Sequence, residues 1–348
     1  MSFWVKSFSI IFLNFLIWGR AQNLAYAQSV SETKKKIDTN YISDYHNELI
    51  TRAFGSRKYT SYALQDKGYA ERLRYLPNSP FNVGVGFNYK MIGINLGFNS
   101  PVINDTKIYG KTNFLDLQSH IYGRKLIVDF YLQRYKGFYL PNTQLIKNNN
   151  TNLIYLRPDL MILNSGVECQ YLFNWRKFTF RGAFLQNEVQ QKSAGSSIVG
   201  IYVGNISVQG DSALVPTHIK YLDFFNRFSF YHSNIRIATL SFGYGYTVVL
   251  PHHFFITAAA SGGLGINNTL LRSRDQGSIS NFGSNVSGTM RIGLGYNARR
   301  YFAGIHYVTT RSSNNSPIQY ARQELGAGNF RISLAHRFTM KKKLFGFY

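Results

Sequence analysis

The chain has 348 residues, with 39 Lys and Arg against 16 Asp and Glu, which gives a formal net charge of +23 at pH 7. Charged residues make up only 16% of it, against about 25% in an average soluble domain, while aromatic residues also reach 16%. Beyond residue 27 no apolar run approaches the roughly 18 residues that a spanning helix needs, which excludes a helical membrane protein. The single cysteine, Cys169, permits no internal disulfide, so backbone pairing and packing must hold the fold.

The N-terminus has the organisation of a secretory signal peptide. Lys6 precedes an apolar segment from Phe8 to Trp18, and Ala25-Tyr26-Ala27 places small residues at the two positions that a signal peptidase reads. The apolar segment is too short to span a bilayer as a helix, and no cysteine follows it that could carry a lipid anchor. We therefore expect residues 1–27 to be removed when the protein is exported.

Residues 28–56 are expected to form an N-terminal extension ahead of the main domain. Ser31–Asp38 is charged, whereas Asp44–Phe54 could form a short helix with Ile50 and Phe54 on one side. If the main domain is a barrel, such a segment either plugs it or lies loosely beneath it, and the loose arrangement is the commoner one for a chain terminus.

The next feature is a two-residue alternation of apolar residues with small or polar ones. Val83, Val85 and Phe87 alternate with Gly and Asn, and residues 92–99 repeat the pattern. Such alternation predicts strands with one apolar face. Because the other face carries mostly Gly and Asn, a barrel with an apolar outside and a polar interior explains it better than a soluble sandwich.

The alternation recurs in segments of about ten residues, the length that a tilted strand needs to cross the hydrocarbon. The clearly patterned segments are 81–89, 92–99, 115–121, 126–133, 163–173, 178–181, 198–207, 240–246, 254–260, 289–296, 301–307 and 330–338. Two weakly patterned segments, around 58–65 and between 211 and 231, raise the count from twelve to fourteen. We predict an all-β fold, an antiparallel transmembrane β-barrel over residues 57–338, with about 14 strands and 12 as the alternative.

The connections are predicted to alternate between tight turns and long polar loops, as in a barrel whose two ends face different compartments. Long loops are expected near 100–112, 136–159, 267–284 and 311–328. Residues 339–348 would follow the last strand as a basic and aromatic tail.

Ionisable residues of both signs fall on the predicted polar face. A charge on the lipid face costs about 2 to 4 kcal/mol near the midplane of the membrane. Because these ionisable residues all fall on the same face of their strands, we expect that face to point into the barrel. They could line a charged pore that selects solutes or, as buried charges more often do, pair with one another and seal the barrel. The set is Asp116, His120, Asp129, Glu168, Arg181, Arg291, His306, Arg331 and Arg337.

The sequence contains no specific catalytic, cofactor or metal motif. A hydrolase at the lipid boundary would need a histidine beside a serine. His120 and His306 lie in the polar phase, but Ser119 points the other way, and Ser241 cannot be placed near either histidine. The histidine pair at 252–253 lacks the spaced Cys, Asp or Glu partners that a metal site requires. We therefore expect no catalytic residue, cofactor or metal.

Four stretches of the chain resemble a known protein family. They are LRYLPNSPFNVGVGFNYKMIGINLGF from Leu73, LDLQSHIYGRKLIVDFYLQRYKGFY from Leu115, NEVQQKSAGSS from Asn187 and FGYGYTVVLPHHFFITAAASGGLGI from Phe242. They resemble the Bacteroidota family catalogued as domain of unknown function 4421, over roughly residues 40–338. The resemblance implies an outer-membrane barrel and supplies no catalytic residue.

The sequence thus favours an integral protein of the bacterial outer membrane, a non-enzymatic channel or a structural or surface-interaction protein. A lipid-modifying barrel hydrolase and a secreted soluble β-sandwich that binds a partner are the alternatives. Expected partners are outer-membrane lipid and lipopolysaccharide, whose phosphates suit a basic protein, and the barrel-assembly machinery during biogenesis. Nucleic acid is not expected in that compartment.

Overall fold

The computed structural model describes residues 37–66, 68, 72–89, 92–99, 105–141, 154–217 and 223–339. The side chains of residues 92–94, 99 and 118–120 are outside this description, and so are the predicted signal peptide and the C-terminal tail beyond residue 339. Within these ranges, no helix has the length and apolar content needed to cross a membrane.

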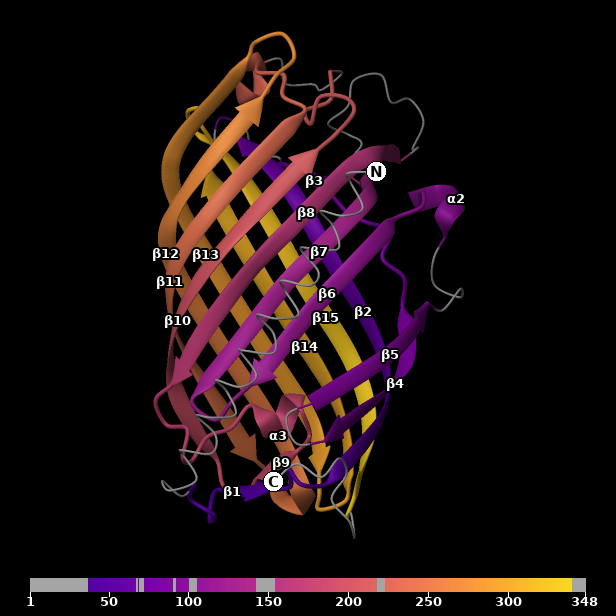
Figure 1. Cartoon of the computed structure of the whole chain (residues 1–348), viewed down its shortest axis with the longest axis vertical. Coiled ribbons are helices and arrows are strands. Elements are labelled where there is room, and N and C mark those ends of the chain that lie inside the picture. The colour runs from indigo at the N-terminus through magenta and orange to yellow at the C-terminus, as the bar shows by residue number, and fades with distance from the viewer. Residues whose placement is uncertain are drawn as a thin grey trace, which may run out of the picture.

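Twelve antiparallel strands of the described chain form one curled ladder, which makes the barrel wall (Figure 1). In the order in which they pair, they are β5 (Ile92–Asn99), β4 (Asn82–Tyr89), β2 (Leu49–Asp66), β15 (Ala321–Phe338), β14 (Tyr301–Asn315), β13 (Ser278–Asn297), β12 (Phe254–Arg272), β11 (His232–Val249), β10 (Ala194–Gln209), β8 (Tyr155–Leu172), β7 (Leu126–Leu140) and β6 (Asn113–Tyr122). The fold is therefore an antiparallel transmembrane β-barrel, and the two packed sheets of the sandwich alternative are wrong.

The remaining strands and helices of the described chain are short. β3 (Arg72–Tyr75) pairs with β2, and β1 (Ile42–Asp44) pairs with β9 (Glu188–Gln190) in a separate two-stranded sheet. The helices are single turns: α2 (Thr106–Tyr109), α3 (Arg181–Phe184), η3 (Phe224–Arg227) and η4 (Pro251–His253). We call the barrel end where β2 begins and β15 ends the turn end, which lies at the bottom of Figure 1, and the opposite end the loop end.

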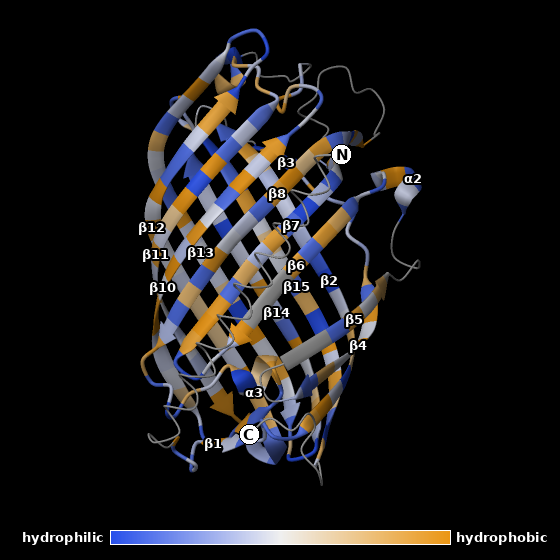
Figure 2. Ribbon diagram, in the orientation of Figure 1, coloured by the Kyte–Doolittle hydropathy of each residue, from blue (hydrophilic) through white to orange (hydrophobic). Residues whose placement is uncertain are grey.

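Exposure alternates along the strands as the sequence predicts. On β11, Leu240, Phe242 and Tyr244 are 68%, 64% and 53% exposed, whereas Thr239, which directly precedes Leu240 and points to the other face, is 2% exposed. Figure 2 shows the same alternation of apolar and polar residues on the neighbouring strands. Apolar side chains that find no protein core on the outside of a closed sheet are stable there only against lipid.

The wall closes differently in its two halves. Toward the loop end, Leu76, just after β3, forms an antiparallel bridge with Tyr139 of β7. Lys58 of β2 also reaches Asp116 of β6, with 3.5 Å between Nζ and Oδ1. Toward the turn end the ladder finishes at β5 on one side and β6 on the other, and no backbone pairing between these two strands occurs in the described chain.

The strand count agrees with the lower prediction, but the set of strands differs. The weak segment at 58–65 is part of β2. The predicted strands at 178–181 and between 211 and 231 are wrong, because α3 begins at Arg181 and η3 occupies Phe224–Arg227. Their aromatic residues pack inside the barrel, and an aromatic at every second position imitates the period of a strand.

Three further expectations are corrected. The helix over Asp44–Phe54 is wrong, because β1 and β2 occupy most of that range, and the barrel starts at Leu49 rather than at residue 57. Ile50 and Phe54 share a face in either structure, since a spacing of four fits both periods. Long loops at 267–284 and 311–328 are also wrong: β12 and β13 leave only 273–277 between them, and β14 and β15 leave only 316–320.

Candidate functional site

The connection between β8 and β10 folds into the barrel at the turn end. It contains α3 and β9, and β9 pairs with β1 in the register Ile42↔Gln190 to Asp44↔Glu188. We call residues 173–193 together with 37–48 the turn-end plug. Phe178, Phe180 and Phe184 of this plug are at most 4% exposed and form one apolar cluster with residues of the wall.

Wall residues hold the turn-end plug by its backbone carbonyls. Arg337 donates from Nε to the Gln186 carbonyl at 2.6 Å, and Arg331 donates from Nη2 to the Phe184 carbonyl at 3.0 Å. His306 Nε2 lies 2.6 Å from the Ala183 carbonyl. Ala183 and Phe184 are the last residues of α3 and Gln186 lies just beyond it, so no following helical turn donates to these carbonyls and the wall supplies their partners. Three residues predicted to face the interior thus meet one short segment of chain.

Side chains add to this attachment. Arg52 of β2 donates from Nη1 to Gln186 Oε1 at 2.6 Å, and Asn297 of β13 donates to the carbonyls of Gly182 and Glu188 at 3.2 and 3.1 Å. No sequence pattern pointed to Arg52, because it lies in a segment with weak alternation.

An ionic cluster connects the two parts of the turn-end plug. Glu188 Oε1 lies 3.0 Å from Arg181 Nη1 and 3.1 Å from Arg124 Nη2, and Arg124 also contacts Asp44 Oδ2 at 2.5 Å. Burial alone would raise the pKa of Asp44, but the hydrogen bond with His46 and the charge of Arg124 together lower it to about 2. Arg181 was predicted on a strand and lies in α3, where its guanidinium neutralises Glu188.

The middle of the barrel holds charges from opposite walls. Arg291 of β13 donates from Nη2 to Asp129 Oδ2 of β7 at 2.7 Å. Asp129 and Glu168 are direct neighbours in the β7–β8 register, a like-charge pair that Arg291 offsets. Glu168 also accepts from Gln170 Nε2 at 2.7 Å. These residues neutralise one another rather than face an unoccupied space.

Asp116 forms the centre of a second interior group. Its carboxylate accepts from Gln133 Nε2 at 3.1 Å and from the Tyr135 hydroxyl at 2.5 Å, and Lys58 lies beside it. The side chain of His120, the remaining residue of the predicted set, lies outside the description.

A second plug fills the loop end, and the sequence did not predict it. The connection between β10 and β11 turns inward over residues 210–217 and 223–231, which we call the loop-end plug. Leu214, Phe225 and Phe230 are fully buried in one apolar cluster with the wall. The Tyr75 hydroxyl donates to the Leu214 carbonyl at 2.6 Å, and the Phe225 amide donates to Asp66 Oδ2 at 3.0 Å.

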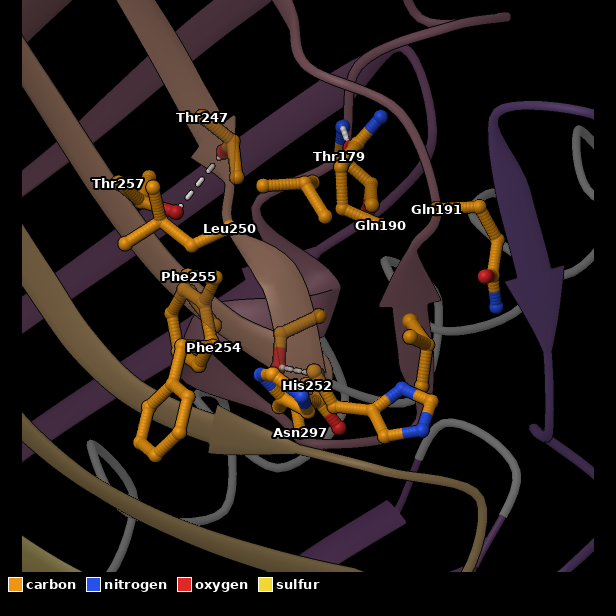
Figure 3. Close-up of a pocket in the computed structure, with 15 residues that line it drawn as sticks. Thr179, Gln190, Gln191, Thr247, Leu250, His252, Phe254, Phe255, Thr257 and Asn297 are labelled. Carbon is orange, nitrogen blue, oxygen red and sulfur yellow. Dashed lines mark hydrogen bonds between the residues drawn. The ribbon is translucent and has the colours of Figure 1, made fainter.

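A cavity of about 230 Å³ lies between the turn-end plug and the β11–β12 turn (Figure 3). His252 and His253 have φ angles of 58° and 67°, in the left-handed region, where side chains are strained. Thr247 and Thr257 line the cavity, and their hydroxyl oxygens form a hydrogen bond of 2.8 Å. No group of three His, Cys, Asp or Glu that could bind a metal occurs among the described residues.

Neither His306 nor His232 has the surroundings of a hydrolase histidine. His306 is buried between the rings of Phe184 and Phe302, at 5.5 and 5.7 Å, and not at a lipid boundary. The sequence missed one Ser–His contact, between Ser207 Oγ and His232 Nε2 at 3.2 Å near the loop end. Nδ1 of His232 is buried without a partner, so no acid orients this ring as in a hydrolase triad.

The fold and its interior define a class, a transmembrane β-barrel with folded connections inside both ends. Within that class the chain belongs to the family described as "Domain of unknown function (DUF4421)", which it matches over residues 36–338. The comparison with curated proteins returns no match.

Solved barrels are similar to the chain at low identity. The outer membrane protease OmpT from Escherichia coli has 8% identity and a TM-score of 0.37, with 85% of this chain and 98% of that chain covered. The translocator domain of the autotransporter NalP from Neisseria meningitidis has 8% identity and a TM-score of 0.30, with 94% and 99% covered. The P. putida toluene transporter TodX has 8% identity and a TM-score of 0.22, with 86% and 93% covered. At such values we base no functional argument on these three proteins.

Proposed function

We propose that the protein is a non-enzymatic barrel of the outer membrane whose interior is closed, and that it acts as a structural or surface-interaction protein rather than as an open channel. The single observation that carries this proposal is the filling of both barrel ends by the described residues of the turn-end plug and the loop-end plug. Phe180 in one plug and Phe225 in the other are buried to 1% and 0% exposure. Water and solutes would have to displace two apolar cores to pass.

Interior charge supports the same proposal. A selective pore needs charged side chains that are free to meet a solute, whereas Arg291, Arg337 and Glu168 are engaged with protein partners. Removing such partners from each other is costly in a low dielectric, so the interior favours the closed arrangement.

The test is conductance of the purified protein in planar lipid bilayers. We expect no steps in current over the range of voltages that a bilayer tolerates, and folded insertion is verified by heat-modifiable migration on gels. Stable, long-lived conductance from folded protein would contradict the proposal and favour the channel.

Location and export are part of the proposal. The apolar outer face of the wall and the signal peptide predicted for residues 1–27 support an outer-membrane position. Fractionation of the cells that make the protein should place it in the outer-membrane fraction, with a mature N-terminus at residue 28.

The hydrolase remains the rival function, and the contact between Ser207 and His232 is the one observation that favours it. Release of fatty acid from phospholipid by the purified protein, abolished by Ser207→Ala, would establish that rival. We expect no release, because Nδ1 of His232 is buried without a partner that would orient the imidazole.

A further inference from the structure

The outer face of the barrel is hollowed on the side formed by β13, β14, β15, β2 and β3. The hollow has a volume of about 490 Å³, and we call it the wall trough. The residues that matter to its chemistry are Tyr59, Arg74, Gly288, Tyr307, Arg311 and Gly326.

Strand phase places these side chains outside the barrel. His306 binds the turn-end plug inside, so Tyr307 and, two and four residues on, Thr309 and Arg311 point outward. Leu73 and Tyr75 are fully buried in the interior cluster, so Arg74 between them also points outward. The trough therefore faces the surroundings of the barrel, not its interior.

Glycine makes the floor of the trough. Gly288, Arg311, Gly326 and Ser61 are successive partners across four strands, so two of these four outward positions carry no side chain. A Cβ on Gly288 would meet nothing nearer than the Ser261 carbonyl oxygen at 3.8 Å. At Gly326 the Ser61 hydroxyl already lies in this space, since an added Cβ would be 2.6 Å from Ser61 Oγ, so the open part of the floor is at Gly288.

A fixed tyrosine borders this floor. Tyr59 lies over Gly328, where an added Cβ would be only 2.3 Å from its ring. Its hydroxyl lies 2.9 Å from the Tyr307 hydroxyl and donates to Thr309 Oγ1 at 3.2 Å. Three side chains from two strands are therefore held together by their own hydroxyl groups.

Two guanidinium groups in the trough have no acidic partner. Among the described residues, no ion pair or hydrogen bond involves the side chain of Arg74 or Arg311, while the nearby Glu324 pairs with Arg72 at 3.1 Å. Guanidinium groups left unpaired next to an apolar surface attract phosphate, which they bind with paired hydrogen bonds.

The apolar and the charged residues of the wall trough lie at different heights along the barrel, as do the chains and the headgroup of a lipid. Arg311 lies four residues beyond Tyr307 toward the loop end, a rise of about 10 Å along a tilted strand. Met290 and Tyr307 lie lower, near the apolar belt, and Arg311 lies higher. A lipid of the membrane that surrounds the barrel would have its chains beside Met290 and Tyr307 and its headgroup beside Arg311.

We propose that the wall trough binds one membrane lipid through its phosphorylated headgroup, with Arg74 and Arg311 on the phosphate and an acyl chain over the glycine floor. Outer-membrane barrels direct their short turns to the periplasm and their longer connections outward, so the loop end would lie in the outer leaflet. Because the guanidinium groups lie toward that end, the occupant is a phosphorylated glycolipid of the lipid A type. This inference rests on the proposed position in the outer membrane.

The test uses the full mature chain in nanodiscs of neutral phosphatidylcholine, with diphosphoryl lipid A as the probe and native mass spectrometry as the readout. Arg74→Gln with Arg311→Gln should weaken retention of one lipid A by about tenfold or more, because charged hydrogen bonds are lost. Gly288→Leu should weaken it without any change of charge, because leucine fills the floor.

Matched controls are available on the same outer face. Arg236→Gln removes an exposed guanidinium from β11, and Ala238→Leu enlarges an exposed side chain on the same strand, which does not line the trough. Both should retain lipid A as the unmodified protein does. Equal losses in test and control variants, or no loss in either test variant, would overturn the proposal.

A final arm separates lipid from free anion. Inorganic phosphate at millimolar concentration should not displace lipid A, and full displacement would mean a free-phosphate site and overturn the lipid proposal. The conductance experiment is independent of this result. A barrel that shows no conductance and does not retain lipid A contradicts only the proposed lipid binding at the wall trough. A barrel that conducts contradicts only the proposed closed interior.

Discussion

Arg291 on β13 and Asp129 on β7 meet across the interior of the barrel, with 2.7 Å between Nη2 and Oδ2. Four strands, β12, β11, β10 and β8, separate them along the ladder, so only a path through the interior joins them. Both side chains are almost fully buried, at 3% and 1% exposure. The ion pair therefore links two strands that are separated by four others along the backbone ladder.

Replacing Arg291 by methionine should destabilise the folded barrel strongly. Asp129 would remain buried beside Glu168 without its cation, and removal of one partner of a buried pair costs about 3–5 kcal/mol. The measurement is denaturant unfolding in detergent micelles, followed by tryptophan fluorescence. Arg291→Met combined with Asp129→Leu should recover most of the loss, and a single variant within about 1 kcal/mol of the parent would refute the argument.

Replacing Arg337 by alanine should loosen the turn-end plug. Arg337 donates to the Gln186 carbonyl and to Asn297 Oδ1, both at 2.6 Å, and so joins the plug to β13 and β15. We expect protease cleavage within residues 173–193 of the folded variant and brief current steps in planar bilayers. Arg300→Ala, an exposed arginine on the turn between β13 and β14, is the control and should show neither effect.

Acid should release the N-terminal part of the same plug. The pKa of Asp44 is lowered from 3.8 to about 2, so its stabilising effect is complete above pH 3.8 and is lost as the pH falls toward 2. The loss amounts to about 2 kcal/mol, and this group contributes no pH dependence between pH 5 and 8. Hydrogen exchange of residues 37–48, corrected for the intrinsic rate, should rise over that acid window. In Asp44→Asn the exchange should already be faster at pH 5, and a parent-like profile in that variant would count against the assignment.

Cys169 offers a test of the lipid-facing side of the wall. It lies in phase with Val167 and Tyr171, which are 38% and 36% exposed on the outside of β8. A charged, water-soluble maleimide should fail to label the folded protein in vesicles and should label it fully after unfolding, whereas a membrane-permeant maleimide should label both. Rapid labelling of the folded protein by the charged reagent would place this face in water.

The sequence predicted the wall well because lipid and interior impose opposite demands on alternate residues. Leu240, Phe242 and Tyr244 on β11 are the clearest case. Outside the apolar belt both faces of a strand are polar, so the alternation fades, and the ends of β12 and β14 looked like loops. The interior phase of Arg331 and Arg337 followed from the same pattern.

The plugs could not be predicted by that reasoning. Phe178 and Phe180 have the spacing of a strand, but they turn into the barrel because a tight turn and α3 direct them there. The partners of Arg331 and Arg337 in the turn-end plug are backbone carbonyls about 150 residues away in the chain, and a carbonyl has no sequence signature. Only the three-dimensional structure reveals such pairings.

Gly137 marks a bulge in the wall that only glycine can form. The β7–β8 register shifts between Lys136 and Phe138, and Gly137 has a φ of 94° there. A Cβ at this position would be 2.3 Å from the Lys111 carbonyl oxygen. Gly137→Ala should therefore lower the free energy of unfolding by about 2 kcal/mol or more, through both backbone strain and the clash. Gly262→Ala, with nothing within 4 Å of its Cβ, should change it by less than about 0.5 kcal/mol. Equal unfolding midpoints for the two variants would mean that the bulge is not required, and the wall would then have to accommodate a side chain where β7 passes Lys111.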